Sequence, residues 1–271
     1  MRRPLKEVLE IYGLAPKKSL GQNFILNPEI TARIASVAGD LNGVTVVEIG
    51  PGPGGLTRSI LDAGAKKVFA IEMDDRCIKA LNDMFEKRLE VIHQDALNVD
   101  PYSLVVKNEP ISIISNLPYN IGTVLLLKWL PHISYYRSLT LMFQKEVVNR
   151  LIALPNTKDY GRLSVMTQWV ANVQKAFDLS PGVFTPPPKV TSSVVHITPK
   201  KKLDNIPFSI MERIVQLAFH QRRKMLKSCL KSINGEKLCE LVSIDPSRRA
   251  ETLSVEEFKR IAVAFLKESD Q

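Results

Sequence analysis

A glycine-rich turn directly after a β-branched run is the feature that most constrains the fold of this chain. Residues 44–49 read Val-Thr-Val-Val-Glu-Ile, and four of the next six residues, Gly50–Gly55, are glycines. The stretch Leu56–Ala63 that follows is compatible with a helix. An apolar run that ends in glycines before a helix is typical of a buried parallel strand that turns sharply. The sequence therefore predicts a strand–turn–helix unit of an α/β sheet.

Similar runs recur along the chain and indicate the rest of this sheet. They are Lys67–Ile71, Leu89–His93, Ile111–Ser115, Leu139–Phe143 and Ser193–Ile197. Helix-compatible stretches such as Arg76–Arg88 separate the first of them, and this alternation indicates a doubly wound parallel sheet. After Pro199 the pattern changes, because Ile210–Leu230 carries apolar residues at helical spacing and Ser254–Glu257 resembles a capping box. We therefore predict two domains, residues 1–199 and a helical domain of residues 200–271.

The charge of the chain is basic and clustered. There are 37 Lys and Arg against 28 Asp and Glu, which gives a net charge of +9. A basic surface attracts polyanions such as nucleic acid, although many basic proteins bind none. Between residues 200 and 231, nine basic residues stand against two acidic ones. We predict that Arg222–Lys224 lies on a helix and binds phosphate groups, with salt bridges between the domains as the alternative.

Several protein classes fit the sequence poorly. The three cysteines have no CxxC spacing, which argues against a disulfide framework or a structural zinc and fits a reducing cytosol. The four histidines show no ligand spacing, so we predict no metal site. The first 18 residues lack an apolar segment, and the longest uncharged stretch, residues 110–127, contains proline and asparagine. We therefore expect a cytoplasmic protein without a membrane span.

The glycine turn leaves two kinds of cofactor open. Gly50, Gly52 and Gly55 satisfy GxGxxG, and Glu72 lies about twenty residues further on, as in proteins that bind a nicotinamide or flavin dinucleotide. The two prolines inside the turn, however, remove backbone donors that a pyrophosphate would bind. Glu48, directly before the turn, is typical of proteins that bind an adenosyl cofactor without a pyrophosphate.

Two carboxylates favour the adenosyl cofactor. Glu72 ends the second predicted strand, where it can accept hydrogen bonds from both ribose hydroxyls, and Asp95 follows the third, where an adenine amino group can donate to it. Alternatively, each carboxylate caps the helix that follows it. Because carboxylates at successive strand ends meet at one edge of a parallel sheet, we favour the cofactor site.

The most specific feature is Asn116-Leu-Pro-Tyr119, directly after the fourth predicted strand. The Asn116 side-chain oxygen and the Leu117 carbonyl can accept hydrogen bonds from an aromatic amine and so aim its lone pair at an incoming methyl group. Pro118 stiffens the turn, and Tyr119 offers a face on which a base can stack. The alternative is a purely structural Asn-Pro turn.

Six ordered motifs together resemble the ribosomal RNA adenine dimethyltransferase family. They are Gly21–Phe24, Glu48–Gly52, Asn116–Tyr119, Phe143–Val148, Tyr160–Ser164 and Phe184–Lys189. The resemblance extends from about Lys17 to the C-terminus. It implies a class I methyltransferase, with a Rossmann-like and mostly parallel seven-stranded sheet, and a small C-terminal all-α domain that binds RNA.

The resemblance also implies roles for individual residues. The S-adenosylmethionine site would be lined by Asn23, Ile25, Gly50, Glu72, Asp95 and Asn116. Tyr119 and Phe184 would sandwich a flipped adenine beside Asn116, Leu117 and Pro118. Phe184 alone, in its proline-rich loop, is more typical of a buried anchor. For five further polar residues the sequence leaves two alternatives open, a contact with RNA or an ordinary position on the surface. They are Gln144, Lys145, Glu146, Arg150 and Arg162.

The activity implied is the transfer of methyl groups from S-adenosylmethionine to the N6 amines of two adjacent adenines near the 3′ end of small-subunit (16S) rRNA, with S-adenosylhomocysteine as the product. The partners would be the small ribosomal subunit and its rRNA, and we expect a monomer. A large-subunit rRNA target remains an alternative. So does a ribosome assembly factor that acts mainly by binding.

Overall fold

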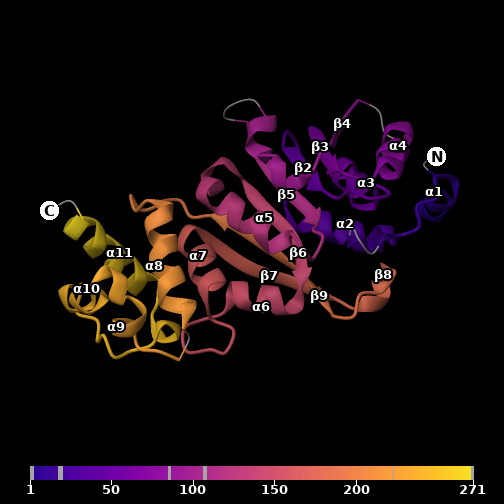
Figure 1. Ribbon diagram of the computed structural model, residues 1–271. Coiled ribbons are helices and arrows are strands. Elements are labelled where there is room, and N and C mark those ends of the chain that lie inside the picture. Colours follow the sequence, from indigo (N-terminus) through magenta and orange to yellow (C-terminus); the bar gives the residue numbers. More distant parts are fainter. Residues whose placement is uncertain (1–2, 18–20, 85–86, 106–108, 222, 270–271) are drawn as a thin grey trace. The chain divides into compact units, whose positions relative to one another are not determined.

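The chain divides into two compact units, which we describe from a computed structural model (Figure 1). The structure describes residues 3–17, 21–84, 87–105, 109–221 and 223–269. The first unit comprises residues 1–148 and 174–199, and the second comprises residues 149–173 and 200–271.

The first unit is built on the predicted α/β sheet. Seven strands lie in the order β4-β3-β2-β5-β6-β9-β7. Their bounds are β2 (Thr45–Ile49), β3 (Lys67–Glu72), β4 (Leu89–His93), β5 (Ile111–Asn116), β6 (Ser138–Gln144), β7 (Ala171–Leu179) and β9 (Ser192–Pro199). β2 pairs in parallel with β3 and β5, β3 with β4, and β5 with β6, whereas β9 pairs antiparallel with β6. The predicted sheet and its seven strands are confirmed.

Two helices cover one face of this sheet. α2 (Pro28–Val37) and α3 (Gly55–Asp62) pack against each other, and their apolar residues join one residue each of β2, β3, β5, β6 and β9 in one buried cluster. The remaining helices of this unit are α1 (Leu5–Ile11), α4 (Asp75–Met84) and α5 (Gly122–Trp129). The order of the strands matters for function, because the chain runs from β2 to β3 and β4 on one side and then returns to β5 on the other side of β2. Such a reversal opens a crevice at the carboxyl ends of the strands.

A second, two-stranded sheet lies outside the main one. β1 (Phe24–Ile25) pairs antiparallel with β8 (Phe184–Thr185), so that Ile25 lies opposite Phe184. The two strands are 160 residues apart along the chain, counted from Phe24 to Phe184. Neither strand is long enough to carry a sequence pattern, so only the tertiary structure pairs them.

The second unit is helical, and it includes one segment that lies outside the predicted helical domain. It contains α8 (Phe208–His220), α9 (Leu226–Cys229), α10 (Gly235–Leu241) and α11 (Val255–Ser269). It also contains α7 (Arg162–Val170), which packs on α8 and α11, and the C-terminal half of α6 (Lys145–Ile152). The predicted boundary after Pro199 coincides with a unit boundary, but residues 149–173 belong with the second unit, because the apolar side of α7 is buried there.

The predicted capping box is present at the start of α11. The Glu257 amide donates to the Ser254 hydroxyl at 3.2 Å, and the Ser254 amide donates to the Glu257 carboxylate at 2.7 Å. These reciprocal bonds satisfy two amides that the first turn of a helix leaves without partners.

The prediction that Arg222–Lys224 lies on a helix is wrong for the part that the structure describes. α8 ends at His220, and Arg223 and Lys224 lie in an exposed turn, while Arg222 lies outside the described residues. Local sequence contains no stop signal here. The amides of Leu226 and Lys227 donate instead to the carbonyls of Arg248 and Pro246, at 2.8 and 3.0 Å, and these tertiary bonds replace a continuing helix.

Candidate functional site

A cavity of about 280 Å³ opens at the carboxyl ends of the central strands of the first unit. Four turns line it: the glycine turn after β2, Glu72 and Met73 at the end of β3, Gln94–Leu97 after β4, and Asn116–Ile121 from the end of β5. Gly21–Ile25 closes a further side. All six residues predicted for the cofactor site line this cavity, namely Asn23, Ile25, Gly50, Glu72, Asp95 and Asn116.

The glycine turn follows the backbone that its sequence predicts. Gly50 and Gly52 have φ angles of +64° and +54°, in the left-handed region that side chains disfavour. A Cβ atom on Gly52 would lie 2.8 Å from Cε1 of Phe24, closer than real contacts allow. The glycines therefore let the turn bend and let Phe24, in β1, pack directly on it.

Glu72 is held in place by three backbone amides. One carboxylate oxygen accepts from the amide of Gly52 at 3.1 Å, and the other from the amides of Met73 and Asp74 at 2.8 and 3.0 Å. Burial nevertheless raises the pKa of Glu72 above its ordinary value, although these amides act in the opposite direction. A carboxylate has about four acceptor positions. The side chain is thus oriented and can still accept hydroxyl groups from within the cavity.

Asp95 caps the helix that follows it, which is one of the two alternatives that the sequence left open. Its side chain accepts from the amide of Leu97 at 2.9 Å and so caps a short 3₁₀ helix, Ala96–Asn98. The same residue lines the cavity. Capping uses one of its two oxygens, and this bond fixes the direction of the other.

Glu48 lies beneath the glycine turn and is 1% exposed. The Thr57 hydroxyl, from α3, donates to its carboxyl group at 2.6 Å. Burial raises the pKa of Glu48 to about 8, while the bond from Thr57 lowers it and the nearby Glu72 raises it. Glu48 also lines the cavity, so the floor of the site holds a carboxyl group that is mostly protonated near neutral pH.

Asn116 is oriented by the segment that carries β1. Its side chain donates to the backbone carbonyl of Asn23 at 3.0 Å. Because a carbonyl can only accept, the atom that faces it must be Nδ2, and the position of the side-chain oxygen Oδ1 follows. Among the described residues, Oδ1 receives no hydrogen bond, so it is available as an acceptor.

Tyr119 is half-buried at the end of the same turn. Its hydroxyl shares a hydrogen bond of 2.5 Å with the hydroxyl of Ser192, the first residue of β9. Burial raises the pKa of Tyr119, while the bond from Ser192 lowers it. Ser192 was not predicted as part of the site, because nothing in its local sequence distinguishes it from other strand residues.

Phe184 lies outside the lining of this cavity. Its side chain is 2% exposed and belongs to the apolar cluster that contains Ile25 and Leu56. It is not among the residues that line the cavity. In this structure Phe184 is therefore the buried anchor that its loop suggested, and a sandwich of adenine between Tyr119 and Phe184 stays a prediction that requires the ring to leave the core.

The polar groups of the cavity fit an adenosyl cofactor better than a dinucleotide. Two carboxylates, Glu72 and Asp95, line it together with Glu48, and like charges would repel a pyrophosphate. Hydroxyl and amino groups, by contrast, donate hydrogen bonds to carboxylates. The residues present thus suit S-adenosylmethionine.

Two of the basic residues predicted to contact RNA have carboxylate partners within the protein. Lys145 lies 2.8 Å from Asp178, and Arg162 lies 2.8 Å from Glu212. Their contacts with RNA stay predictions, as do those of Gln144, Glu146 and Arg150. Among the described residues, no three His, Cys, Asp or Glu side chains are placed to hold a metal ion, and no described helix is long and apolar enough to cross a membrane.

Comparisons with known proteins show a matching family model and full-length relatives. A family model described as ribosomal RNA adenine dimethylase matches residues 13–267. The chain is 53% identical to the ribosomal RNA small subunit methyltransferase A of Allorhizobium ampelinum, over 96% of both chains, and 52% identical to that of Agrobacterium fabrum, again over 96% of both.

Solved structures show the same architecture. A dimethyladenosine transferase from Plasmodium falciparum superposes with a TM-score of 0.74 at 26% identity, covering 90% of this chain and 97% of the other. The 23S rRNA methyltransferase ErmE superposes with a TM-score of 0.66 at 24% identity, covering 92% and 100%. With the matched family model and full-length relatives at about half identity, the chain belongs to the ribosomal RNA adenine dimethylase family.

Proposed function

We propose that this protein transfers methyl groups from S-adenosylmethionine to the N6 amines of two adjacent adenines near the 3′ end of small-subunit rRNA. The observation that carries the proposal is the placement of Asn116. Its amide nitrogen is tied to the Asn23 carbonyl, and its free oxygen lies at the wall of a cavity that also contains Glu72 and Asp95. Family membership supplies the class of reaction.

The cofactor supplies an electrophilic methyl group on a sulfonium centre. Glu72 is placed to accept hydrogen bonds from ribose hydroxyls, because three amides already hold its carboxylate in position. Asp95 is placed to accept from the adenine amino group of the cofactor. These contacts bind and orient the cofactor and require no movement of the protein at the moment of reaction.

The Asn116 turn acts on the target amine. The lone pair of an adenine amine is delocalised into the ring, which makes the amine a weak nucleophile. Hydrogen bonds from the amine to Oδ1 of Asn116 and to the carbonyl of Leu117 favour a pyramidal nitrogen whose lone pair points at the methyl group. Pro118 restricts the backbone that carries this carbonyl. The methylated amine is acidic and releases its proton to water, so the site needs no strong base.

Tyr119 provides a stacking surface for the target base. Stacking of a base on an aromatic ring contributes about 1–3 kcal/mol. The hydrogen bond between Tyr119 and Ser192 fixes the position of the phenol oxygen and therefore the direction of the ring's long axis. A base that stacks here must leave its helix or come from a single strand, because an amine inside a duplex is not accessible.

The proposal that the substrate is small-subunit rRNA rests on the names of the relatives that match over their full length. The full-length matches are named small subunit methyltransferases, and their identity to this chain is 52–53% in the two compared above. The similarity to the 23S rRNA methyltransferase ErmE concerns the fold alone. We therefore propose the small ribosomal subunit as the partner, and we expect a cytoplasmic monomer.

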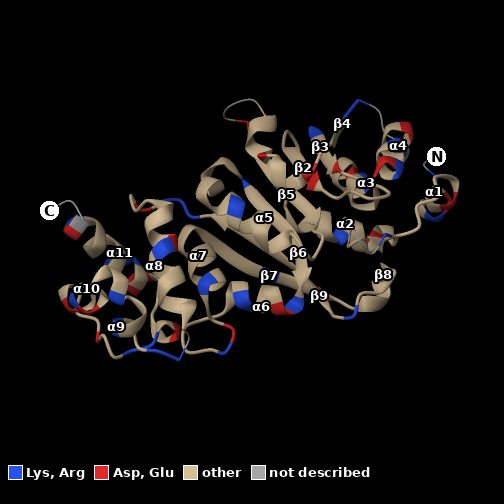
Figure 2. Ribbon diagram, viewed as in Figure 1, with Lys and Arg blue, Asp and Glu red and all other residues tan. Residues whose placement is uncertain are grey.

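The second unit supplies basic residues for binding RNA. Figure 2 shows a basic residue on α8, which is an arginine. Arg223 and Lys224 are exposed in the turn after α8. We propose that residues 200–271 dock on rRNA phosphates and that this docking also permits a role in subunit assembly, independent of methyl transfer.

The test is transfer of a labelled methyl group from S-adenosylmethionine to small subunits that lack dimethyladenine. Mature small subunits and large subunits serve as controls. We expect N6,N6-dimethyladenine in the undermethylated small subunits alone. Label in large-subunit rRNA would move the target and keep the chemistry. Binding to small subunits without any label would favour the assembly factor.

A further inference from the structure

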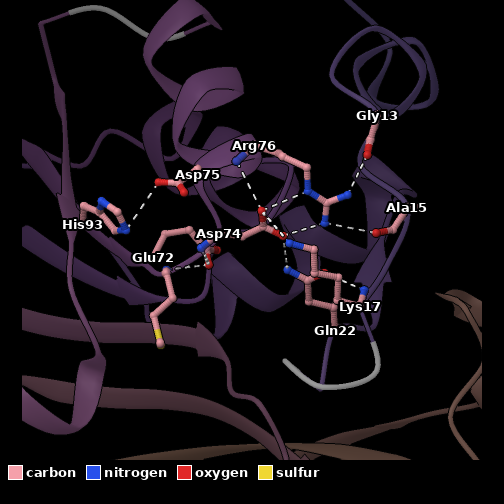
Figure 3. Close-up of polar contacts among 10 residues, drawn as sticks. Gly13, Ala15, Lys17, Gln22, Glu72, Asp74, Asp75, Arg76 and His93 are labelled. Atoms are coloured by element: carbon pink, nitrogen blue, oxygen red, sulfur yellow. Dashed lines mark hydrogen bonds and ion pairs between the residues drawn. The ribbon is translucent and has the colours of Figure 1, made fainter.

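An arm of the chain that precedes β1 is tied to the loop between β3 and α4. Four residues of this arm lie beside Asp74 and Arg76 (Figure 3), namely Gly13, Ala15, Lys17 and Gln22. Asp74 follows Glu72 by two residues, and its side chain is only 1% exposed although it lies in a loop. A carboxylate buried to this degree needs several partners.

Asp74 has those partners on both sides. The Arg76 guanidinium donates to its two oxygens at 3.0 and 2.7 Å, a bidentate pair. On the arm, the Gln22 amide donates to it at 3.2 Å, and the Lys17 ammonium lies 3.6 Å away. The Arg76 guanidinium holds the pKa of Asp74 well below its usual range, so this side chain remains ionised wherever the protein is folded near neutral pH.

Arg76 extends the same connection to an earlier part of the arm. Its guanidinium also donates to the carbonyl of Gly13 at 2.7 Å and to the carbonyl of Ala15 at 3.2 Å. Gln22 in turn accepts from the backbone amide of Lys17 at 2.9 Å. The arm is therefore held at four positions by one charged pair.

The arm leads directly into the site. Gly21, Gln22 and Asn23 line the cavity, and the Asn23 carbonyl is the group that orients Asn116. On its other side, the backbone amide of Asp74 donates to Glu72 at 3.0 Å. One loop thus connects the wall formed by the arm with the carboxylate placed for the ribose.

We propose that Asp74, through its pair with Arg76, is a positioning residue that holds the N-terminal arm as a wall of the methyl-donor cavity. The inference rests on the proposed function, because it assigns the cavity to the methyl donor. Asp74 does not line the cavity itself and acts through Gln22, Asn23 and Glu72. Loss of its charge should release the arm and weaken the cofactor site without unfolding the sheet.

The test measures binding of S-adenosylhomocysteine by calorimetry to the full chain and to Asp74→Asn. The matched control is Glu257→Gln, which neutralises the carboxylate of another bidentate pair, with Arg248 in the second unit. We expect Asp74→Asn to raise Kd about tenfold or more, and Glu257→Gln to leave Kd unchanged. Arg76→Lys keeps the charge but loses the planar fork, and it should also raise Kd.

Hydrogen exchange of the arm separates this role from simple stabilisation of the fold. In Asp74→Asn, amides of residues 13–17 and 21–23 should exchange faster, while those of β2 and β5 keep their protection. An unchanged Kd in Asp74→Asn, or an equal loss in Glu257→Gln, would overturn the positioning role. Failure of the unaltered protein to bind S-adenosylhomocysteine would instead count against the proposed function, and the assigned role would fall with it.

Discussion

Individual residues of the site carry constraints that follow from hydrogen bonding and burial. A specific hydrogen-bond partner holds each of three side chains, those of Asn116, Glu48 and Glu72. Asn116 is oriented by a carbonyl, Glu72 by amides, and Glu48 by burial beside Thr57. Two predictions belong at this scale.

Replacing Asn116 by Ala should abolish methyl transfer and leave subunit binding largely intact. The substitution removes the acceptor that aims the amine, and preorganised groups of this kind contribute about a hundredfold or more to rate. The measurement is methyl transfer alongside subunit binding. Asn98→Ala, at an exposed asparagine that does not line the cavity, is the control. Loss of transfer and binding together would contradict a separation between the two roles.

The raised pKa of Glu48 predicts that the free energy of unfolding depends on pH. The folded protein holds the Glu48 proton up to about pH 8, whereas the ordinary pKa is 4.5, so folding takes up a proton between these values. The contribution of Glu48 to the free energy of unfolding is therefore complete below about pH 4.5 and is lost as the pH rises to about 8.

Between about pH 6 and pH 8, the unaltered protein should lose about 2 kcal/mol of unfolding free energy relative to Glu48→Gln, as measured by urea unfolding. Comparing the two proteins cancels the contributions of other titrating groups. Glu10→Gln, which removes an exposed carboxylate, controls for the change of charge. Parallel pH curves for Glu48→Gln and the unaltered protein would show that Glu48 ionises normally.

At the scale of elements, the turn between β2 and α3 packs against a strand that is not part of the central sheet. β1 belongs to the small sheet with β8, and its Phe24 ring covers the glycine turn. Gly55, the first residue of α3, is equally constrained, because a Cβ there would lie 2.8 Å from the carbonyl of Ile25. β1 and the turn therefore form one wall of the site.

Gly52→Ala should disturb this wall. The left-handed backbone costs about 1–2 kcal/mol for a residue with a side chain, and the new methyl group would displace the Phe24 ring. We expect a lower thermal midpoint and weaker binding of S-adenosylhomocysteine. Gly182→Ala is the matched control, because nothing lies within 4 Å of its added Cβ. Normal cofactor binding by Gly52→Ala would mean that the turn tolerates movement of Phe24.

At the scale of the whole molecule, the proposed function assigns cofactor binding to the first unit and docking on RNA to the second. The first unit contains the cavity, and the second contains the exposed basic residues after α8. Such a division predicts that RNA affinity and cofactor affinity can be changed separately.

Replacing Arg223 and Lys224 by Ala should weaken subunit binding and reduce its dependence on salt. Each lost phosphate contact reduces the slope of log K against log salt by about 0.7–0.9. Affinity for S-adenosylhomocysteine should not change. Lys237→Ala, in the same unit and already paired with Glu268, is the control. An unchanged salt slope would show that the turn after α8 does not contact phosphates.

Much of this protein was determined by local sequence. The β-branched runs, the glycine turn and the polar residues at strand ends predicted the sheet and placed Glu72 and Asp95 at one edge of it, because periodicity and backbone sterics act over a few residues. The other cofactor-site positions, Asn23 and Ile25 among them, followed from the family resemblance. Other features arose only from contacts between distant segments. The β1–β8 pair, the end of α8 at His220 and the bonds from Arg76 to the carbonyls of Gly13 and Ala15 all depend on partners remote in sequence. Such contacts carry no local signal, since each is decided by which groups the completed fold brings together.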